Sequence, residues 1–459
     1  MSSKRHYIKR AFSYFSRNGF SQTLYKALER LQRDGTEASY VPETADDASL
    51  QAQREHVFKD PRRFSILVPV YETNIGLLRI MLESVGQQSY ENWELIIADA
   101  SIDSSRRRTV ESFQKKHSFS DQKVRYIRID DNKGISANTN VALDAASGDY
   151  IALLDHDDVL EKTALFDIMS AIEERERAGL SDSCAKVMVA YTDEDKVSED
   201  GTKYFDVHRK PDFDPVLLCT NNYICHLLVI DTHLARSVGG FRPRFDGAQD
   251  HDLVLRCTRD LNREEIVHVP KVLYHWRSIA GSTSEDPSSK LYAYEAGKSA
   301  VADHLEKCGI SAKITDSPHL GFFEIEYESL CEDRESFMIS ISPDLKALDD
   351  KCIDRMLSVM QLPYVGIVTG KIIGVNGRIE SAGYDIDRDG GKIPRFSGLN
   401  RHFSGYMHGA CTDRLVDSCS PDCMVVRKEA VERFDPEIKL KDGYFVYFDP
   451  KAVFKRKRI

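Results

Sequence analysis

Aspartate side chains follow hydrophobic runs at several points of the sequence, with a spacing that suits metal binding. Asp99 ends one such run, and Asp155 and Asp157 follow another, Tyr150–Leu154. Two carboxylates held side by side repel each other unless a cation lies between them, so the pair indicates a Mg²⁺ or Mn²⁺ site. Such an ion neutralises a diphosphate. The alternative is that these acids only cap the helix that begins near Lys162.

A sheet that holds these carboxylates at one edge is predicted from Phe64 onward. Short β-branched runs alternate with amphipathic stretches, which is typical of an α/β fold with a doubly wound, mostly parallel sheet. Strands are expected at 64–68, 94–98, 124–129, 150–154 and 187–191, and helices near 76–88, 104–117, 136–146 and 162–175. Ligands of such sheets bind beyond the carboxyl ends of the strands, which is where the acids occur.

Composition limits the classes of function. The chain has 459 residues, enough for two to four domains, and its net charge of −10 argues against sequence-blind nucleic-acid binding. Its ten cysteines include no Cys-x-x-Cys pair. We therefore expect reduced thiols and a cytoplasmic location, with neither a zinc site nor a disulfide framework. No apolar run is long enough to span a membrane.

The two ends of the chain are strongly basic. The first 33 residues hold eight Lys or Arg and one acid, and the last nine hold five Lys or Arg. Apolar spacing predicts two short amphipathic helices in 1–33, broken at Asn18-Gly19, and then a poorly ordered polar linker over 34–63. We expect the basic ends to lie on an anionic membrane surface; helices packed on the protein body are the alternative.

Several motifs in order resemble the family 2 glycosyltransferases of the GT-A fold, over roughly residues 64–285. The segments that carry the resemblance are Ser65–Glu72, Ala98–Asp103, Asn132–Asn140 and Ala146–Asp158. Glu72, Ala98 and Thr139 depart from the residues usual in the family. The resemblance implies an inverting, metal-dependent transfer from a UDP- or dTDP-sugar to a glycan or polyprenyl-linked acceptor in cell-surface polysaccharide synthesis.

The resemblance also implies roles for single residues. Asp99 would read the nucleotide base, and Asp155 and Asp157, with His275, would hold the cation. The donor site as a whole would be lined by Pro69, Tyr71, Glu72, Asp99, Asn132, Gly134, Asp155 and His156.

A downstream segment, Val238–Arg256, resembles the acceptor side of the family. It contains Gln249-Asp250 where Glu-Asp is usual, and Asp250 would be the general base that accepts the proton of the attacking hydroxyl. Asp246 and Asp252 compete for this role. The alternative is that these acids stabilise the start of a helix.

Six further residues are secondary candidates. Trp276 suits stacking on a sugar, and Arg277 suits contact with phosphate, although core packing is equally open for the indole. Asp193 and Asp195 resemble a segment near the donor sugar, with a solvated acidic turn as the alternative. Asp252 and Gln249 would lie on the acceptor side.

The second half resembles a damaged copy of the first. Phe337–Asp344 resembles a strand that leads into an Asp-x-Asp motif, and Val365–Gly383 resembles the following segment. Nothing in 286–336 repeats the nucleotide-binding strands, so we expect a helical connector over 286–320 and a smaller, catalytically silent domain over 321–459. It would support acceptor binding, self-association or the first domain.

Two other functions remain open from the sequence. A non-catalytic scaffold that binds sugar nucleotides or glycans and pairs with an active transferase would also use these motifs. Asp155–Val159 fits the Asp-x-Asp-x-Val of haloacid-dehalogenase-type phosphatases, in which the first Asp is a nucleophile. That fold places its motif on the first strand, whereas here about 90 residues of strand and helix precede it.

Overall fold

The computed structural model describes residues 2–33, 40–178, 186–279, 291–328, 334–434 and 438–458. The chain forms two compact units. The first unit comprises Ser39–Phe213 and Asn222–Ala300, and the second comprises Met1–Ala38, Asp214–Asn221 and Val301–Ile459. The predicted boundary near residue 285 lies outside the described residues.

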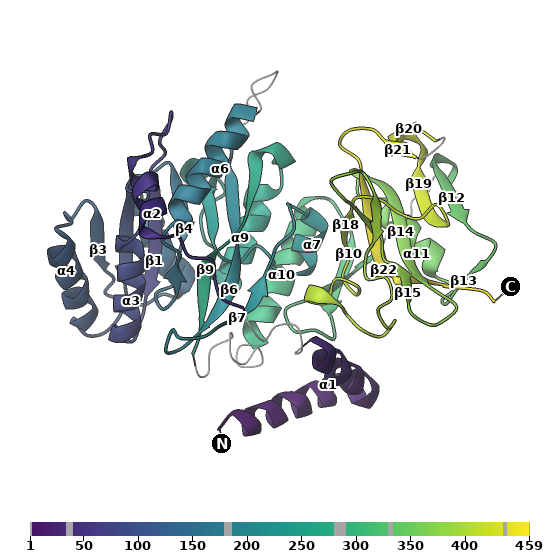
Figure 1. The fold of residues 1–459 in the computed structure, drawn as a ribbon, viewed down its shortest axis with the longest axis horizontal. Coiled ribbons are helices and arrows are strands. Elements are labelled where there is room, and N and C mark those ends of the chain that lie inside the picture. Colours follow the sequence, from purple (N-terminus) through teal and green to yellow (C-terminus); the bar gives the residue numbers. More distant parts are fainter. Residues whose placement is uncertain are drawn as a thin grey trace. The chain divides into compact units, whose positions relative to one another are not determined.

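The first unit is built on a nine-stranded sheet of order β3-β2-β1-β4-β8-β6-β9-β5, with β7 beside β6 (Figure 1). β3, β2, β1 and β4 are parallel neighbours, β8 runs antiparallel to both β4 and β6, and β6 and β9 are parallel. The strands are β1 (Phe64–Val70), β2 (Trp93–Asp99), β3 (Val124–Arg128), β4 (Tyr150–Leu153), β5 (Val159–Leu160), β6 (Val189–Ser198), β7 (Tyr204–His208), β8 (Leu228–Asp231) and β9 (Ile266–Ser278).

Helices connect the parallel strands, as the alternating pattern predicted. They are α3 (Ile75–Gly86), α4 (Ser105–His117), α5 (Ile135–Ala145) and α6 (Ala164–Ala178), followed by α8 (Thr232–Ser237) and α9 (Gln249–Thr258). Asn74 caps α3, because its side-chain oxygen accepts from the backbone N–H groups of Gly76 and Leu77. β1 and β2 are buried on both faces, as expected for central strands of a covered parallel sheet.

The segment before β1 is not the poorly ordered linker that its composition suggested. It contains α2 (Asp47–Glu55), which Asp46 caps through a 2.8 Å bond from the Ser49 backbone, and Leu50 of this helix is buried. Local capping and one apolar anchor therefore order a segment that is otherwise polar.

The second unit has a smaller, mostly antiparallel sheet of order β12-β19-β14-β22-β13. These strands are β12 (Phe337–Ile341), β13 (Leu345–Ala347), β14 (Val365–Ile373), β19 (Cys423–Arg427) and β22 (Phe445–Arg456), with α11 (Cys352–Val359) after β13. Shorter elements are α7 (Pro215–Thr220), β10 (Ala312–Asp316), β11 (Phe323–Tyr327), β15 (Ile379–Ser381), β16 (Tyr384–Ile386), β17 (Lys392–Pro394), β18 (Arg414–Val416), β20 (Val431–Arg433) and β21 (Lys439–Leu440). α10 (Leu291–Lys307) begins in the first unit and ends in the second.

The second sheet repeats the distal half of the first. In chain order, β12, β13, β14, β19 and β22 correspond to β4, β5, β6, β8 and β9, and the spatial orders β4-β8-β6-β9-β5 and β12-β19-β14-β22-β13 match. The directions also match, because only β6 with β9 and β14 with β22 pair in parallel. Among the described residues, no strands corresponding to β1, β2 and β3 join this sheet. A smaller second domain is thus present, and its described part has no counterparts of β1, β2 and β3.

A shared irregularity fixes the residue correspondence. β9 bulges after Val269 at Pro270-Lys271, and β22 bulges after Asp449 at Pro450-Lys451. Counting along the paired strands from this point makes Ser342 equivalent to Asp155, Asp344 to Asp157 and Asp422 to His226.

The N-terminal segment is helical, with a break where it was predicted. α1 (Ser2–Arg33) contains non-helical backbone at Gly19, whose φ of 75° suits glycine. One face of the helix contacts the rest of the second unit: the Tyr25 ring stacks on His402 at 4.3 Å, and the Glu29 carboxylate accepts from Ser404 and Gly405. Phe20 is 70% exposed.

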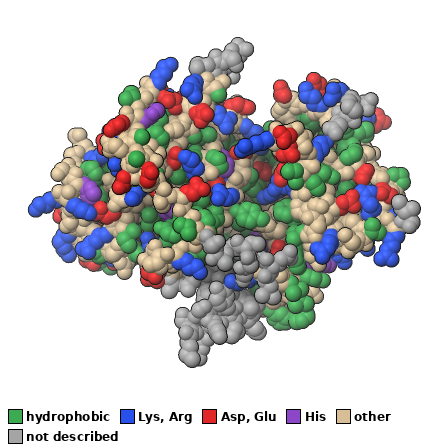
Figure 2. All heavy atoms as spheres, in the orientation of Figure 1, with side chains coloured by type: hydrophobic (Ala, Val, Ile, Leu, Met, Phe, Trp, Pro, Cys, Tyr) green, Lys and Arg blue, Asp and Glu red, His purple; other side chains and the backbone are tan. Residues whose placement is uncertain are grey.

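The basic C-terminal residues belong to the body of the second unit, where several of them have partners within the protein. Lys451 pairs with Glu324 at 2.7 Å, and the Lys457 ammonium donates to the Pro343 carbonyl. Arg456 contacts three carboxylates. On the face in Figure 2, basic and acidic side chains are interspersed. No helix among the described residues has the length and apolarity needed to cross a membrane.

A buried aspartate makes the stability of the second unit depend on pH. Burial, with the neighbouring Asp449 charge, raises the pKa of Asp413 to about 7. The pKa of Asp413 is higher in the folded state than in the unfolded state. The stability that this group contributes is therefore fully present below about pH 4 and is lost as the pH rises from there through 7. We expect Asp413→Asn to flatten the fall in melting temperature between pH 5 and 8. An unchanged pH profile would contradict this.

Candidate functional site

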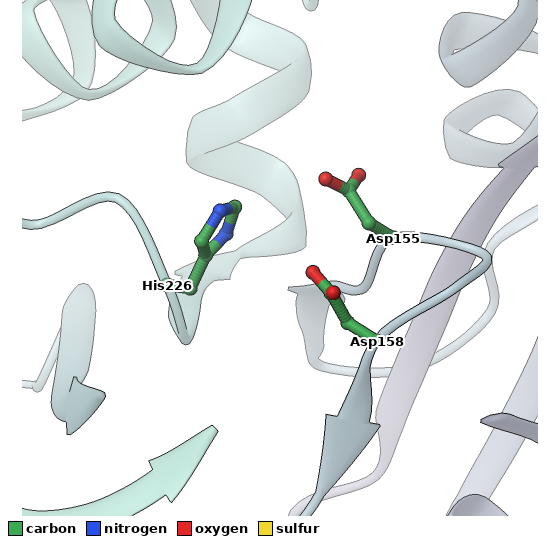
Figure 3. Close-up of side chains that lie close together, drawn as sticks. All are labelled: Asp155, Asp158 and His226. Atoms are coloured by element: carbon green, nitrogen blue, oxygen red, sulfur yellow. The ribbon is translucent and has the colours of Figure 1, made fainter. Parts of the chain in front are cut away.

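Three potential metal ligands, from segments next to β4, β5 and β8, lie close together. Asp155 lies in the loop after β4, Asp158 directly before β5 and His226 shortly before β8, and their side chains point toward one another (Figure 3). One ligand atom from each lies within 4.8 Å of the others, and within the described ranges no other such trio occurs. Two carboxylates and an imidazole suit Mn²⁺ or Mg²⁺.

The acids of this cluster are crowded. Burial, reinforced by the Asp155 and Asp157 charges, raises the pKa of Asp158 well above its usual value. Burial and the Asp155 charge also raise the pKa of Asp157. The protein gives Asp158 two donors, the Tyr274 hydroxyl at 2.5 Å and the Arg277 backbone N–H at 2.7 Å. A bound cation would relieve the remaining repulsion, so the residues present fit the predicted metal.

His275 does not join this cluster, so its predicted role as a metal ligand needs correction. Its ring is buried, with Nδ1 2.7 Å from Asp195 and Nε2 3.5 Å from Glu161. Burial alone would lower its pKa, but the two carboxylates raise the pKa to about 9. Both ring nitrogens of His275 thus face carboxylates outside the cluster, and His226 supplies the imidazole of the cluster instead.

Asp193 and Asp195 are structural residues within β6, and they form no solvated turn. Asp193 accepts from the Lys210 backbone and from His268, each at 2.9 Å. Asp195 accepts from His275 and from the Tyr40 hydroxyl at 3.0 Å. Both are buried, so the structure gives no open face for donor sugar at either residue.

Arg277 holds the aspartate loop in place. Its guanidinium donates to the backbone carbonyls of Asp157 and Glu199, each at 2.9 Å, and the side chain is buried. This engagement corrects the predicted phosphate contact. The neighbouring Trp276 is half-buried, and its ring meets that of His226 edge-on at 5.7 Å.

The segment Asn222–His226 links the metal cluster to Asp250. Asp250 lies in the first turn of α9, and its carboxylate accepts from the Asn222 side chain at 2.8 Å. Cys225, adjacent to His226, approaches the same carboxylate oxygen at 3.8 Å. Burial, followed by nearby acids that include Asp250 and Asp155, raises the pKa of the Cys225 thiol. Asp250 and the cluster therefore flank one short segment.

The acids that compete with Asp250 have structural partners. Asp252 is buried between Arg242 and Arg256, and both guanidinium groups donate to it. Asp246 accepts from the Ser136 backbone at the start of α5. A Cβ on Gly134, whose φ is +96°, would lie 2.2 Å from Asp246, so that approach requires glycine.

Gln249, beside Asp250, has a local role in the loop before α9. Its side-chain oxygen accepts from the Gly247 backbone at 2.9 Å. This contact helps to shape the loop at the start of the helix that carries Asp250.

The predicted nucleotide end lies at the carboxyl ends of β1 and β2. Asp99 is fully buried and accepts from the Ser101 backbone and from the Tyr126 hydroxyl at 2.6 Å. Glu72 accepts from the Ile102 backbone and pairs with Arg106 at 3.1 Å. Tyr126 and Arg106 belong to no recognised motif, so the sequence alone did not identify them as site residues.

The remaining donor-side candidates lie on loops beside these strands. Tyr71 is 48% exposed directly after β1, and Pro69 is half-buried within it. Asn132 accepts from the Gly134 backbone and from the Asn138 side chain, which orders the loop before α5. The His156 ring lies 3.5 Å from the Asp157 carboxylate.

A buried lysine that the sequence did not mark fixes the Asn222–His226 segment. The Lys210 ammonium donates to the carbonyls of Ile224 and His226 and pairs with Glu194 at 3.2 Å, with its side chain 0% exposed. Burial opposes ionisation of Glu194, but the Lys210 and His208 side chains outweigh burial and lower the pKa of Glu194. The pair therefore positions both His226 and the neighbours of Asp250.

Replacing Lys210 should weaken the fold as well as the site. Lys210→Met leaves the Glu194 charge buried without its partner, and such a loss costs about 3–5 kcal/mol of unfolding free energy. Urea denaturation of this variant should therefore show a large loss against Lys203→Met, which removes an exposed lysine near the same hairpin. Equal stability of the two variants would contradict the positioning role.

The equivalent position in the second unit is occupied by a positively charged side chain, that of Arg456. Asp344 and Asp422 are equivalent to Asp157 and His226, while Ser342 replaces Asp155. The Arg456 guanidinium contacts Asp344, lies 2.9 Å from Asp422 and pairs with Glu380. A side-chain guanidinium thus neutralises the acids that remain there.

Comparison with known proteins agrees with this geometry. Residues 65–221 match the family described as Glycosyl transferase family 2. The chain therefore contains a family 2 glycosyltransferase domain, and its α/β sheet is that of the GT-A fold, as the motifs predicted.

Individual relatives share parts of the chain. The uncharacterized protein y4gI of Sinorhizobium fredii is 42% identical over 53% of this chain and 25% of its own length. The O-antigen biosynthesis protein RfbC of Myxococcus xanthus is 28% identical over 70% of this chain and 24% of its own. The chain thus spans about a quarter of the length of these relatives. S. aureus TarS 1-349 in complex with UDP-GlcNAc is 20% identical, with a TM-score of 0.40 over 53% of this chain and 66% of its own.

Proposed function

We propose that the first unit transfers a sugar from a nucleotide diphosphate sugar to a hydroxyl of a glycan or lipid-linked acceptor, with inversion at the anomeric carbon. The observation that carries the proposal is the placement of Asp250 and the Asp155 cluster on either side of Asn222–His226. One site thereby combines a carboxylate that can take a proton with ligands for a cation. An inverting transfer needs both functions.

The mechanism follows from these positions. Asp250 accepts the proton of the acceptor hydroxyl as its oxygen bonds to the anomeric carbon and the bond to the diphosphate breaks. Asp155, Asp158 and His226 would hold Mg²⁺ or Mn²⁺, and the predicted ligand Asp157 lies in the same loop but outside this trio. The bound ion would neutralise the diphosphate that leaves. Asn222 keeps the Asp250 carboxylate oriented through its 2.8 Å bond.

The donor nucleotide would lie over the ends of β1 and β2. Asp99 would contact the base, with its carboxylate oriented by Tyr126, and Pro69, Tyr71, Glu72, Asn132, Gly134 and His156 would line the site. Uridine or thymidine diphosphate sugars are the donors that we propose. The printed name of the M. xanthus relative, an O-antigen biosynthesis protein, supports a surface polysaccharide as the product class.

The phosphatase alternative loses its structural basis. Asp155 follows β4, the fourth strand along the chain, and three parallel neighbours precede it. A nucleophilic aspartate of that class belongs at the end of the first strand. The second unit, in which Arg456 neutralises the remaining acids, is proposed to be catalytically silent.

A thermal-shift screen tests the proposal. UDP- and dTDP-sugars should raise the melting temperature only when Mn²⁺ or Mg²⁺ is present, because a ligand stabilises the state that binds it. Donor hydrolysis with Mn²⁺ then separates an active transferase from a non-catalytic scaffold. If no nucleotide sugar shifts the melting temperature with either metal, the proposal fails.

We also propose that α1 holds the protein at an anionic membrane surface, near a lipid-linked acceptor at the inner face of the cell membrane. Phe20, Leu24 and Leu28 recur every four residues and are exposed, whereas Tyr25 and Glu29 face the protein. An exposed apolar stripe with basic neighbours suits insertion among anionic headgroups.

Charge substitution on this stripe tests the membrane contact. The double variant Phe20→Glu, Leu24→Glu should lose co-sedimentation with anionic vesicles at low salt, because two carboxylates oppose insertion and are repelled by the lipid. The variant Val41→Glu, Val57→Glu alters two exposed apolar residues outside the helix and should bind as the wild type does. Equal binding by both double variants would exclude this role of α1.

A further inference from the structure

A cavity of about 210 Å³ lies in the second unit, among α11, β11 and β22. Three aspartates, one glutamate, two tyrosines, two basic residues and one serine line it, together with two apolar side chains. The charged residues and tyrosines are Glu326, Asp354, Asp413, Asp449, Lys351, Arg355, Tyr327 and Tyr447. A concave site with a few convergent polar groups is the usual form of a small-ligand site.

The polar groups of the cavity are only partly satisfied by one another. The Tyr447 hydroxyl donates to one oxygen of Asp413 at 2.9 Å. Asp449 accepts from two backbone N–H groups of the β22 bulge through one oxygen, and its other oxygen lies 3.7 Å from Arg355 Nε. That Nε is buried and donates no hydrogen bond. A buried donor without an acceptor is costly, so a bound acceptor would stabilise it.

The duplicated architecture has apolar residues in the first unit where this cavity has polar ones. The register that aligns the two bulges makes Tyr447 and Asp449 equivalent to Val267 and Val269 of β9. Both valines belong to the apolar core of the first unit. Burying a carboxylate in place of a valine lowers stability unless partners compensate, and the two backbone donors of Asp449 satisfy only one of its oxygens.

The charges around the cavity select the ligand class. The two buried carboxyl groups, Asp413 and Asp449, disfavour an anion. Arg355 and Lys351 disfavour a further cation at these buried groups. The other two acids, Glu326 and Asp354, are exposed, and Asp354 already pairs with Arg334 at 2.9 Å. A neutral polyol offers donors to the aspartates and acceptors to the basic residues. Burial and Asp449 raise the pKa of Asp413 to about 7, so this carboxyl can also donate to a ligand hydroxyl near neutral pH. The volume lies below the roughly 300–1,000 Å³ of sites for drug-sized ligands, and suits one sugar ring.

We propose that this cavity binds one neutral sugar unit of a glycan, separately from the candidate transfer site. The assignment of the sugar to an acceptor or product glycan rests on the proposed function, whereas binding of a neutral sugar does not. All residues that line the cavity belong to the second unit. The second unit would then act as a glycan-binding module, although it lacks a donor site.

Saturation-transfer NMR on the full chain tests this site, with glucose, galactose, N-acetylglucosamine and glucuronate as probes and no nucleotide present. At least one neutral sugar should give saturation transfer, and glucuronate should give none. Asp413→Asn, which keeps the side-chain shape, and Lys351→Met, at an exposed position on the cavity wall, should each weaken the titrated affinity at least fivefold. Lys351→Met keeps the test valid if the buried variant unfolds.

Two controls separate this site from the transfer site. Asp442→Asn changes an exposed acid of the same unit and should leave sugar binding unchanged. Asp157→Ala, a change beside the candidate transfer site, should also leave sugar binding by the second unit unchanged. Failure of the proposed transferase function would therefore not alter the result of this binding test. The proposal is overturned if no neutral sugar binds, or if binding survives in both Asp413→Asn and Lys351→Met.

Discussion

Asp250→Asn should abolish sugar transfer while leaving donor binding intact. The amide keeps the shape of the carboxylate and its contact with Asn222, but it cannot take the proton of the attacking hydroxyl. Loss of a general base costs roughly 10²–10⁴-fold in rate, so we expect kcat to fall at least about 100-fold with little change in the affinity for nucleotide. Steady-state kinetics with a defined acceptor measures this.

The matched control for Asp250→Asn is Asp252→Asn. Asp252 lies two residues away but is buried between two arginines, so its replacement should lower thermal stability. In the fraction that remains folded, the chemical step should persist. Near wild-type turnover by Asp250→Asn would remove Asp250 from the mechanism and reopen the choice of base.

Asp155→Ala should remove both metal dependence and transfer. Asp155 is the member of the metal cluster directly after β4, and its loss leaves Asp158, which already has two protein donors, and His226. Removal of one electrostatic partner from a developing negative charge typically costs about 10²–10³-fold in rate. We therefore expect activity to fall about 100-fold or more and the Mn²⁺ requirement to shift to higher concentration.

Removal of the metal from the wild type should mimic this variant. EDTA should abolish transfer, and added Mn²⁺ should restore it in the wild type and in Glu174→Gln, an exposed α6 control. Added Mn²⁺ should not restore Asp155→Ala. Full activity in EDTA would contradict a role for the cluster in binding a catalytic cation.

The parallel half of the first sheet could be predicted from the sequence because its determinants are local. β1 to β4 are short β-branched runs, and a helix follows each of the first three directly and follows β4 after the two-residue β5; buried parallel strands have this composition. The antiparallel half was harder. β5 has two residues and β8 has four, so neither gives a periodic pattern that marks a strand.

The candidate site was partly predictable for a related reason. Asp155 and Asp250 occur in recognisable motifs, whereas His226 is a lone histidine before a short apolar strand, and only the tertiary fold brings it to Asp155. His275 looked like the better ligand because it follows a strand of the expected motif. Its partners Asp195 and Glu161 come from distant segments, and no local pattern shows that they hold its ring.

Lys210 illustrates a second limit of sequence reasoning. A lysine after a hairpin is normally a solvated residue, and only the fold shows that its ammonium is buried against two carbonyls and Glu194. The motifs of the second unit were enough to recognise it as a copy of the first. Only its strand order and the shared bulge show which strands of the first sheet have no counterpart among its described residues. They also identify the guanidinium that replaces the metal site.

Isothermal titration of UDP into the wild type and Asp155→Ala, each with and without Mn²⁺, tests the central claim most directly. We predict that UDP binds the wild type with Mn²⁺, that EDTA weakens binding at least tenfold, and that Asp155→Ala binds weakly under both conditions. Binding of UDP that is equally tight with Mn²⁺ and with EDTA, and unchanged in Asp155→Ala, would contradict a metal-dependent nucleotide-sugar site at the end of β4.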